Sequence, residues 1–163
     1  MHVYRMHTTQ HLPIDIDLAW TFFSDPRNLQ KITPEDMSFV IDTPVPERIH
    51  SGLFIGYRLR VPPGIPLRWW TEIKHVEAPH SFIDEQRSGP YQLWYHEHRF
   101  IAVDGGVEIQ DTVHYALPFR LLGRLAHWLF VHRQLQQIFT YRRQVLEDQF
   151  PGERSIHAAG ATT

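Results

Sequence analysis

The chain has 163 residues, of which 42% are hydrophobic, and its 16 basic and 18 acidic side chains leave a formal net charge of -2 at pH 7. This length predicts one domain with its own core, and the balanced charge gives no electrostatic basis for binding nucleic acid. The chain has no cysteine, which excludes disulfides and thiolate chemistry. Because we find no signal-peptide pattern and no run near the roughly 20 apolar residues of a membrane span, we expect a cytoplasmic protein without a membrane span.

The N-terminal part of the chain predicts one strand followed by short helices. Residues 2–12 alternate between two faces, as a strand does. Asp15 is suited to cap a short helix that ends at Ser24-Asp25-Pro26, because proline cannot continue a helix. Residues 27–33 add another helical turn before the next proline.

Alternating patterns then predict three strands, at residues 53–61, 67–77 and 81–88. A loop stiffened by three prolines, residues 61–66, joins the first two strands. The inward face of the third strand is ambiguous, because Phe82, which shares its face with Asp84 and Gln86, competes with Ile83 for the interior. We expect Phe82 to point inward.

A hairpin follows, and its turn is Asp104-Gly105. Apolar and ionisable residues alternate on its inner face: Trp94, His96, His98 and Phe100 before the turn, and Ile109, Asp111, Val113, Tyr115 and Leu117 after it. A two-residue Asp-Gly loop sets the register of the strands, so that His98 lies opposite Asp111. Their Cβ atoms are then about 5 Å apart, which brings a His98 to Asp111 hydrogen bond within reach inside an apolar interior.

After Pro118 the apolar residues recur at three- and four-residue steps, which predicts one long amphipathic helix. About 25 residues at 1.5 Å each span about 37 Å, enough to cross a sheet. Residues 151–163 are small and polar and predict a disordered tail behind a single domain of residues 1–150. Consecutive antiparallel strands with helices on one side define an α+β domain, and a curved sheet around a long helix encloses space for a ligand.

The order of elements and three motifs carry a resemblance to a known family: Ser24-Asp25-Pro26-x-Asn28-Leu29-x-x-Ile32-Thr33-Pro34, Gly89-Pro90-x-x-x-Trp94-x-His96-x-His98-x-Phe100 and Asp111-x-Val113-x-Tyr115-x-Leu117-Pro118. Over about residues 3–150 the chain resembles the SRPBCC superfamily, and more narrowly its bacterial branch of cyclase/dehydrase or ligand-binding SRPBCC proteins. The resemblance implies the START-like helix-grip fold, a curved antiparallel sheet of about seven strands wrapped around a long C-terminal helix, with short helices after the first strand. It also implies a hydrophobic pocket between sheet and helix, which holds lipids, polyketides, quinones or hormones in different members.

We therefore predict that the chain binds a small hydrophobic molecule, such as a lipid, a polyketide or a quinone-like compound. The predicted ligand-binding residues come from the hairpin and from the helix, which faces it: Trp94, His96, His98, Phe100, Asp111, Val113, Tyr115, Leu125, Leu129 and His132. No cofactor and no metal site are predicted, because a His-x-His pair is common in strands and the pattern places no third histidine beside it. The sequence does not indicate the oligomeric state.

Two alternatives stay open beside this hypothesis. In the first, Asp111 orients His98 as the general acid or base of a polyketide cyclase/dehydratase, which makes these two the candidate catalytic residues. In the second, the chain is an accessory domain whose interior is filled by side chains, and the His98–Asp111 pair only specifies the register. No nucleophile motif or phosphate-binding loop is present, so a binding protein is favoured over an enzyme.

Overall fold

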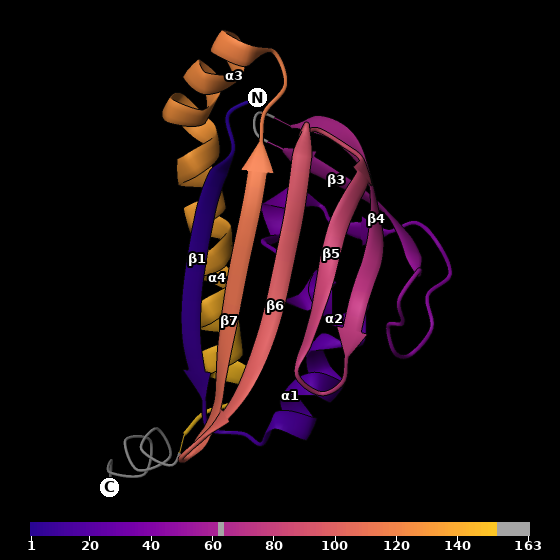
Figure 1. Ribbon diagram of the computed structural model, residues 1–163, viewed down its shortest axis with the longest axis vertical. Coiled ribbons are helices and arrows are strands. Elements are labelled where there is room, and N and C mark those ends of the chain that lie inside the picture. Colours follow the sequence, from indigo (N-terminus) through magenta and orange to yellow (C-terminus); the bar gives the residue numbers. More distant parts are fainter. Residues whose placement is uncertain (62–63, 153–163) are drawn as a thin grey trace, which may run out of the picture.

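The computed structural model describes residues 1–61 and 64–152, with the side chains of residues 120 and 122 excepted. The elements in chain order are β1 (Tyr4–Leu12), α1 (Ile16–Phe23), α2 (Asn28–Lys31), η1 (Glu35–Met37), β2 (Val40–Ile41), β3 (Phe54–Val61), β4 (Ile65–Glu77), β5 (Ser81–Ser88), β6 (Leu93–Val103), β7 (Gly106–Ala116), α3 (Arg120–Ala126), η2 (His127–Val131) and α4 (His132–Gln149). Figure 1 shows the arrangement of the longer helices and strands. Two prolines of the predicted 61–66 loop, at positions 62 and 63, and residues 153–163 of the predicted tail lie outside the described residues. None of the described helices has the length and the apolar character to cross a membrane.

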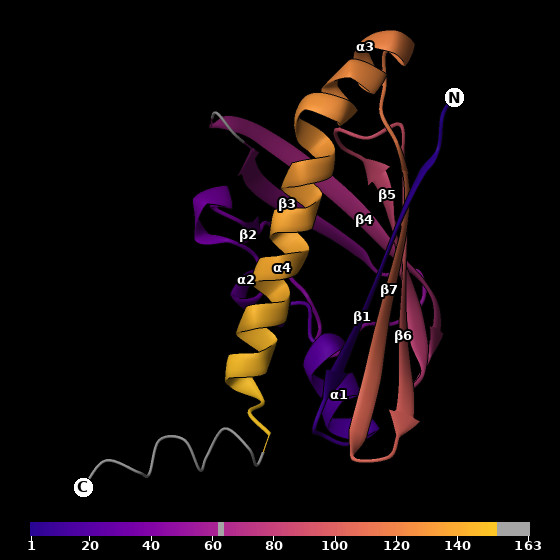
Figure 2. The same cartoon turned by 90° about the vertical axis from the view of Figure 1, so that its left-hand side faces the viewer.

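The seven strands form one antiparallel sheet in the order β1-β7-β6-β5-β4-β3-β2. Neighbours in the sequence are neighbours in the sheet, except that β1 pairs with β7. The pairing of β4 with β5 is interrupted twice, after Trp70 and after Lys74, and such irregularities bend a strand. Figure 2 shows the sheet curving around α4, with α1 below it. The predicted α+β fold, with a sheet wrapped around a long helix, is confirmed.

The predicted register of the β6–β7 hairpin is also confirmed. Trp94 pairs with Tyr115 and His98 pairs with Asp111. The turn differs in detail from the usual Asp-Gly geometry, because Gly105 adopts a left-handed φ of 76° while Asp104 does not. A two-residue loop still joins the strands, so the register is unchanged.

The elements before the hairpin follow their local signals. Asp15 caps α1 by accepting a hydrogen bond from the Leu18 backbone N–H at 2.6 Å. Phe82 points inward as expected, and Ile83 is buried as well. The side chains of α1 pack under the sheet, where Trp20 contacts both Phe82 and Phe100 edge to face. This packing closes one end of the space between the sheet and α4.

The C-terminal helix is continuous but not uniform, because η2 is a π-helical segment between α3 and α4. Only its second part covers the sheet, and Figure 2 shows α3 extending above the sheet's upper end. The prediction that Leu125, Leu129 and His132 face the hairpin is therefore wrong, since all three are exposed. A π turn holds more residues than an α turn, so the apolar stripe that a 3.6-residue period assigns to one face is shifted there.

Candidate functional site

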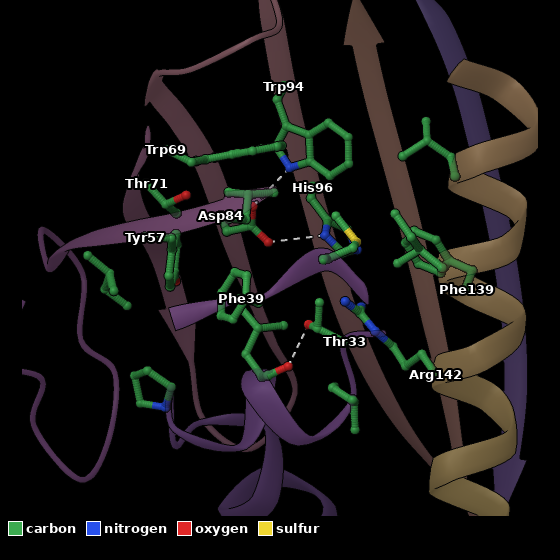
Figure 3. A pocket seen from close by; sticks show the side chains of 18 of the residues that line it. Thr33, Phe39, Tyr57, Trp69, Thr71, Asp84, Trp94, His96, Phe139 and Arg142 are labelled. Atoms are coloured by element: carbon green, nitrogen blue, oxygen red, sulfur yellow. Dashed lines mark hydrogen bonds and ion pairs between the residues drawn. The ribbon is translucent and has the colours of Figure 1, made fainter. Parts of the chain in front are cut away.

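A pocket of about 300 Å³ lies between the inner face of the sheet and α4. Aromatic and aliphatic side chains from several elements form most of its wall, among them Phe22, Leu59, Trp69, Leu135 and Phe139. Figure 3 shows the pocket with Trp69 on the sheet side and Phe139 on the helix side. The volume is at the lower end of the range of small-molecule sites. The helix-grip arrangement thus leaves open space where the sequence predicts a ligand.

Four ionisable side chains from three adjacent strands meet at one wall of this pocket, and we call them the His–Asp cluster: Asp84, His96, His98 and Asp111. Asp84 on β5 pairs directly with His96 on β6, and Asp111 on β7 pairs directly with His98 on β6. Side chains directly opposite and diagonal to each other on one sheet face are within reach. The strand register therefore brings each imidazole close to both carboxylates.

Each histidine of the cluster bridges the two aspartates. His96 has Nδ1 at 3.1 Å from Asp84 Oδ2 and Nε2 at 3.0 Å from Asp111 Oδ1. His98 has Nε2 at 3.0 Å from Asp84 Oδ2 and Nδ1 at 2.8 Å from Asp111 Oδ1. The last contact is short but its angle is unsuited to a hydrogen bond, which leaves His98 Nδ1 without a hydrogen-bond partner among the described residues. The predicted His98–Asp111 neighbours are in contact, but Asp111 forms its hydrogen bond with His96.

Trp94 completes the arrangement around Asp84. Its indole Nε1–H donates to Asp84 Oδ1 at 3.0 Å, while the other carboxylate oxygen faces the two imidazoles. Figure 3 shows this hydrogen bond and the contact between Asp84 and His96. Both oxygens of Asp84 are thus engaged, and the plane of its carboxylate is fixed.

Burial and mutual charge act in opposite directions on the pKa values of the cluster. Burial would lower the pKa of His96, but the charge of Asp84 and the hydrogen bonds with both aspartates outweigh it and raise that pKa to about 9. Burial would raise the pKa of Asp84 and of Asp111. The two histidines outweigh that effect and hold the pKa of each carboxyl well below its ordinary value. At neutral pH the cluster therefore holds two carboxylates and at least one imidazolium.

The residues of the cluster differ in whether they line the pocket. Asp84, His96 and His98 line the pocket, as does Trp94, whereas Asp111 is buried behind them. His98 also stacks on Phe82, with the ring centroids 4.2 Å apart. Three of the predicted ligand-binding residues of the sheet, Trp94, His96 and His98, thus reach the pocket.

The other predicted residues of the sheet are buried away from the pocket. Phe100 packs in the cluster of apolar side chains around α1, while Val113 and Tyr115 pack in a second one with Leu135 and Phe139. Phe100, Val113 and Tyr115 do not line the pocket. Tyr115 instead contacts His127 of η2 through its hydroxyl, at 2.9 Å from Nε2. These residues hold the sheet against the helix.

The helix contributes a different set of residues from the one predicted. Leu125, Leu129 and His132 lie outside the pocket, and the residues that line it come from η2 and α4: Val131, Gln134, Leu135, Ile138, Phe139 and Arg142. Arg142 lies over the Phe139 ring, with the guanidinium carbon 4.9 Å from the ring centroid. Its Nε is buried without a hydrogen-bond partner among the described residues. A cationic group therefore stands at the helix wall, opposite the sheet (Figure 3).

Sequence reasoning missed Asp84 and Arg142. A signal for Asp84 was present in the sequence. If Phe82 points inward, Asp84 points inward too, because residues two apart in a strand share a face. The pairing of β5 with β6 then places Asp84 opposite His96. The sequence of β5 does not specify its pairing partner, so it does not place Asp84 beside His96. Arg142 sits in a helix rich in arginine, and only the rotation of the helix on the sheet decides which arginine faces the pocket.

No protein-family model matches the sequence, and the search of curated proteins finds no match. Solved structures of other proteins are similar to this chain in fold. TTHA0849 from Thermus thermophilus is 18% identical with a TM-score of 0.68, over 97% of this chain and 100% of that chain. The major latex-like protein 151 from Panax ginseng is 10% identical with a TM-score of 0.67, over 92% and 99%. Protein Ms6760 from Mycobacterium smegmatis is 18% identical with a TM-score of 0.62, over 91% and 98%.

At these identities the likeness establishes the fold. The chain has the helix-grip fold over most of its length, as the resemblance to SRPBCC proteins implied. What the pocket holds has to be argued from its own residues.

Proposed function

We propose that this protein binds a small hydrophobic molecule in the pocket between the sheet and α4. The observation that carries the proposal is the contrast within the pocket, an apolar wall with one polar patch formed by Asp84, His96 and His98. Sites for small molecules combine such a wall with a few placed polar groups, which fix the orientation of the ligand. The fold supports the same function, since helix-grip proteins typically bind hydrophobic ligands.

The polar groups suggest what the ligand carries. At the sheet wall, the carboxylate of Asp84 accepts hydrogen bonds and lines the pocket, which suits a ligand hydroxyl, as found in polyketides, reduced quinones and lipids. Arg142 at the helix wall has a buried donor without a partner among the described residues, which suits a second oxygen or an anionic group. We infer a ligand with an apolar body and oxygen atoms toward two opposite sides.

The two alternatives receive less support. A cyclase/dehydratase with His98 as general acid or base needs a ring nitrogen free to face the substrate, but both nitrogens of His98 contact carboxylates. An accessory domain with a filled interior is not favoured by a pocket of about 300 Å³.

We also propose that the protein is cytoplasmic, and fractionation of the source cells tests this location.

A matched pair of substitutions on α4 tests the proposal. Ile138 lines the pocket, whereas Gln136 is exposed on the same helix. We expect Ile138→Trp to fill the pocket and to weaken binding of the fluorescent probe anilinonaphthalene sulfonate by about tenfold or more. Gln136→Trp adds the same side chain outside the pocket and should leave the affinity unchanged.

Native mass spectrometry of the purified protein gives a second measurement that needs no probe. We expect a co-purified small molecule on the parent protein and on Gln136→Trp, and less of it on Ile138→Trp. Equal probe affinity in both folded variants, together with an empty parent protein, would contradict the proposal.

A further inference from the structure

Three ligand atoms of the His–Asp cluster converge at the pocket wall. Asp84 Oδ2 lies 3.1 Å from His96 Nδ1 and 3.0 Å from His98 Nε2, and the three atoms lie within 4.8 Å of one another. We propose that these atoms bind one divalent transition-metal ion of the Zn²⁺ or Fe²⁺ kind. The site goes beyond the proposed function and does not depend on it.

The spacing of the three atoms suits such an ion. Zinc binds imidazole nitrogen and carboxylate oxygen at about 2.0–2.1 Å, which places neighbouring ligand atoms of a tetrahedral site roughly 3.3 Å apart. The two measured separations from Asp84 Oδ2 are 3.0 and 3.1 Å. Two of the three separations are thus close to this spacing, and the third, between the two imidazole nitrogens, is at most 4.8 Å.

The residues behind the three ligands are those that a metal site needs in its outer shell. A histidine that binds metal through one nitrogen donates its other N–H to a carboxylate or carbonyl. Here the remaining nitrogens, His96 Nε2 and His98 Nδ1, lie 3.0 and 2.8 Å from the same oxygen of Asp111. Trp94 holds the oxygen of Asp84 that does not face the histidines. Asp84 and His96 are thus each oriented by a hydrogen bond with a buried partner, and His98 is in contact with Asp111.

The hydrogens and charges of the cluster are compatible with the ion as well. Without a metal, a ring that presents both nitrogens to carboxylate oxygens has to be an imidazolium with two N–H groups. With a metal ion at His96 Nδ1 and His98 Nε2, His96 donates its remaining N–H to Asp111, and the Nδ1–H of His98 lies beside the same carboxylate oxygen. The charge of a divalent ion then replaces the imidazolium charge in balancing Asp84 and Asp111.

The donor set selects the kind of ion. Imidazole nitrogen suits zinc and iron, whereas Ca²⁺ and Mg²⁺ prefer sites made of oxygen. Three protein ligands leave at least one coordination position, as in catalytic rather than structural metal sites. Because the three ligands line the pocket, that position faces the space where water or an oxygen of a bound molecule would sit.

Calorimetric titration of the chelator-treated full chain tests the site. We expect one Zn²⁺ per chain to bind and Mg²⁺ not to compete. Asp84→Asn and His98→Gln should each weaken zinc binding by more than about a hundredfold, and Asp111→Asn by about tenfold to a hundredfold. His114→Gln is the matched control, since His114 lies on the opposite face of β7, and it should bind as the parent does.

A spectrum of the parent protein keeps the test independent of variants that fail to fold. In nitrogen-15 correlation spectra of the histidine rings, Zn²⁺ should shift only His96, at Nδ1, and His98, at Nε2. The proposal is overturned if zinc binding does not saturate at one ion per chain, or if zinc shifts the nitrogen signals of exposed histidines instead. It is also overturned if folded Asp84→Asn and His98→Gln proteins bind zinc as tightly as the parent does. A parent that binds the fluorescent probe but no zinc would remove the metal site and leave the proposed function standing.

Discussion

Among the single residues of the pocket wall, each member of the His–Asp cluster is stabilised by its contacts with the others. His96 is almost fully buried and contacts both aspartates. A buried charge is tolerated only with a partner, and removing one partner costs more than the pair contributes. The cluster is thus sensitive to any single change.

Substitution of Asp111 tests this dependence in the metal-free protein. We expect Asp111→Asn to lower the free energy of unfolding at pH 7 by about 3 kcal/mol, because it leaves the histidines with one carboxylate fewer. Denaturant unfolding measures the change. Asp148→Asn on the exposed side of α4 is the control and should be neutral. An Asp111→Asn protein as stable as the parent would show that the buried pairs contribute nothing.

The raised pKa of His96 predicts a dependence of stability on pH. In the unfolded chain the ordinary value of 6.5 applies, so the stabilisation is fully present below pH 6.5 and is lost as the pH rises toward the folded pKa of about 9. The lowered pKa values of Asp84 and Asp111 act at the acid end, where stabilisation present above pH 3.8 is lost as the pH falls.

We therefore expect the stability of the chelator-treated protein to decline between pH 6.5 and pH 9. Denaturant unfolding across this range measures the decline, and His96→Gln should flatten the curve. A decline of the same size in a folded His96→Gln protein would assign the effect to another group.

At the scale of elements, the C-terminal helix divides into two parts with different roles. Leu135 of α4 is 4% exposed and Leu125 of α3 is 52% exposed, although both fit the apolar periodicity of one helix. Periodicity describes which residues share a face but not where the partner surface ends. The sheet covers α4 and leaves α3 uncovered.

Two leucine truncations separate these parts. We expect Leu135→Ala to lower the free energy of unfolding by about 2–5 kcal/mol, since it removes buried methyl groups and leaves a cavity. Leu125→Ala should change it by at most about 0.5 kcal/mol. Chemical denaturation of both variants checks the difference, and equal losses would mean that α3 packs on the molecule as firmly as α4.

At the scale of the whole molecule, stability should be highest at the hairpin. Strands β6 and β7 lie inside the sheet and pair on both sides, and their inner residues belong to both apolar clusters. Helix α3 stands at the end of the molecule (Figure 1). We expect backbone amides of β6 and β7 to exchange hydrogen most slowly, and those of α3 much faster. Exchange measured by NMR checks this order, and protection of α3 equal to that of β7 would contradict it.

Most of the elements, the register of the β6–β7 hairpin and the contact of His98 with Asp111 could be predicted from the amino-acid sequence. These features depend on local rules: the period of two along a strand, the Asp-Gly turn at Gly105 and the end of a helix at Pro26. Each acts over a few residues, so the amino-acid pattern specifies it without knowledge of distant parts of the chain.

The set of residues that form the pocket depends instead on how distant parts of the chain pack together. Asp84 enters the cluster because β5 pairs with β6, and Arg142 enters the pocket because of how α4 is rotated on the sheet. Leu125 leaves the interior because the helix extends past the sheet and includes a π turn. Such long-range pairing and packing depend on the fit of whole surfaces, which a one-dimensional pattern of residue types does not encode.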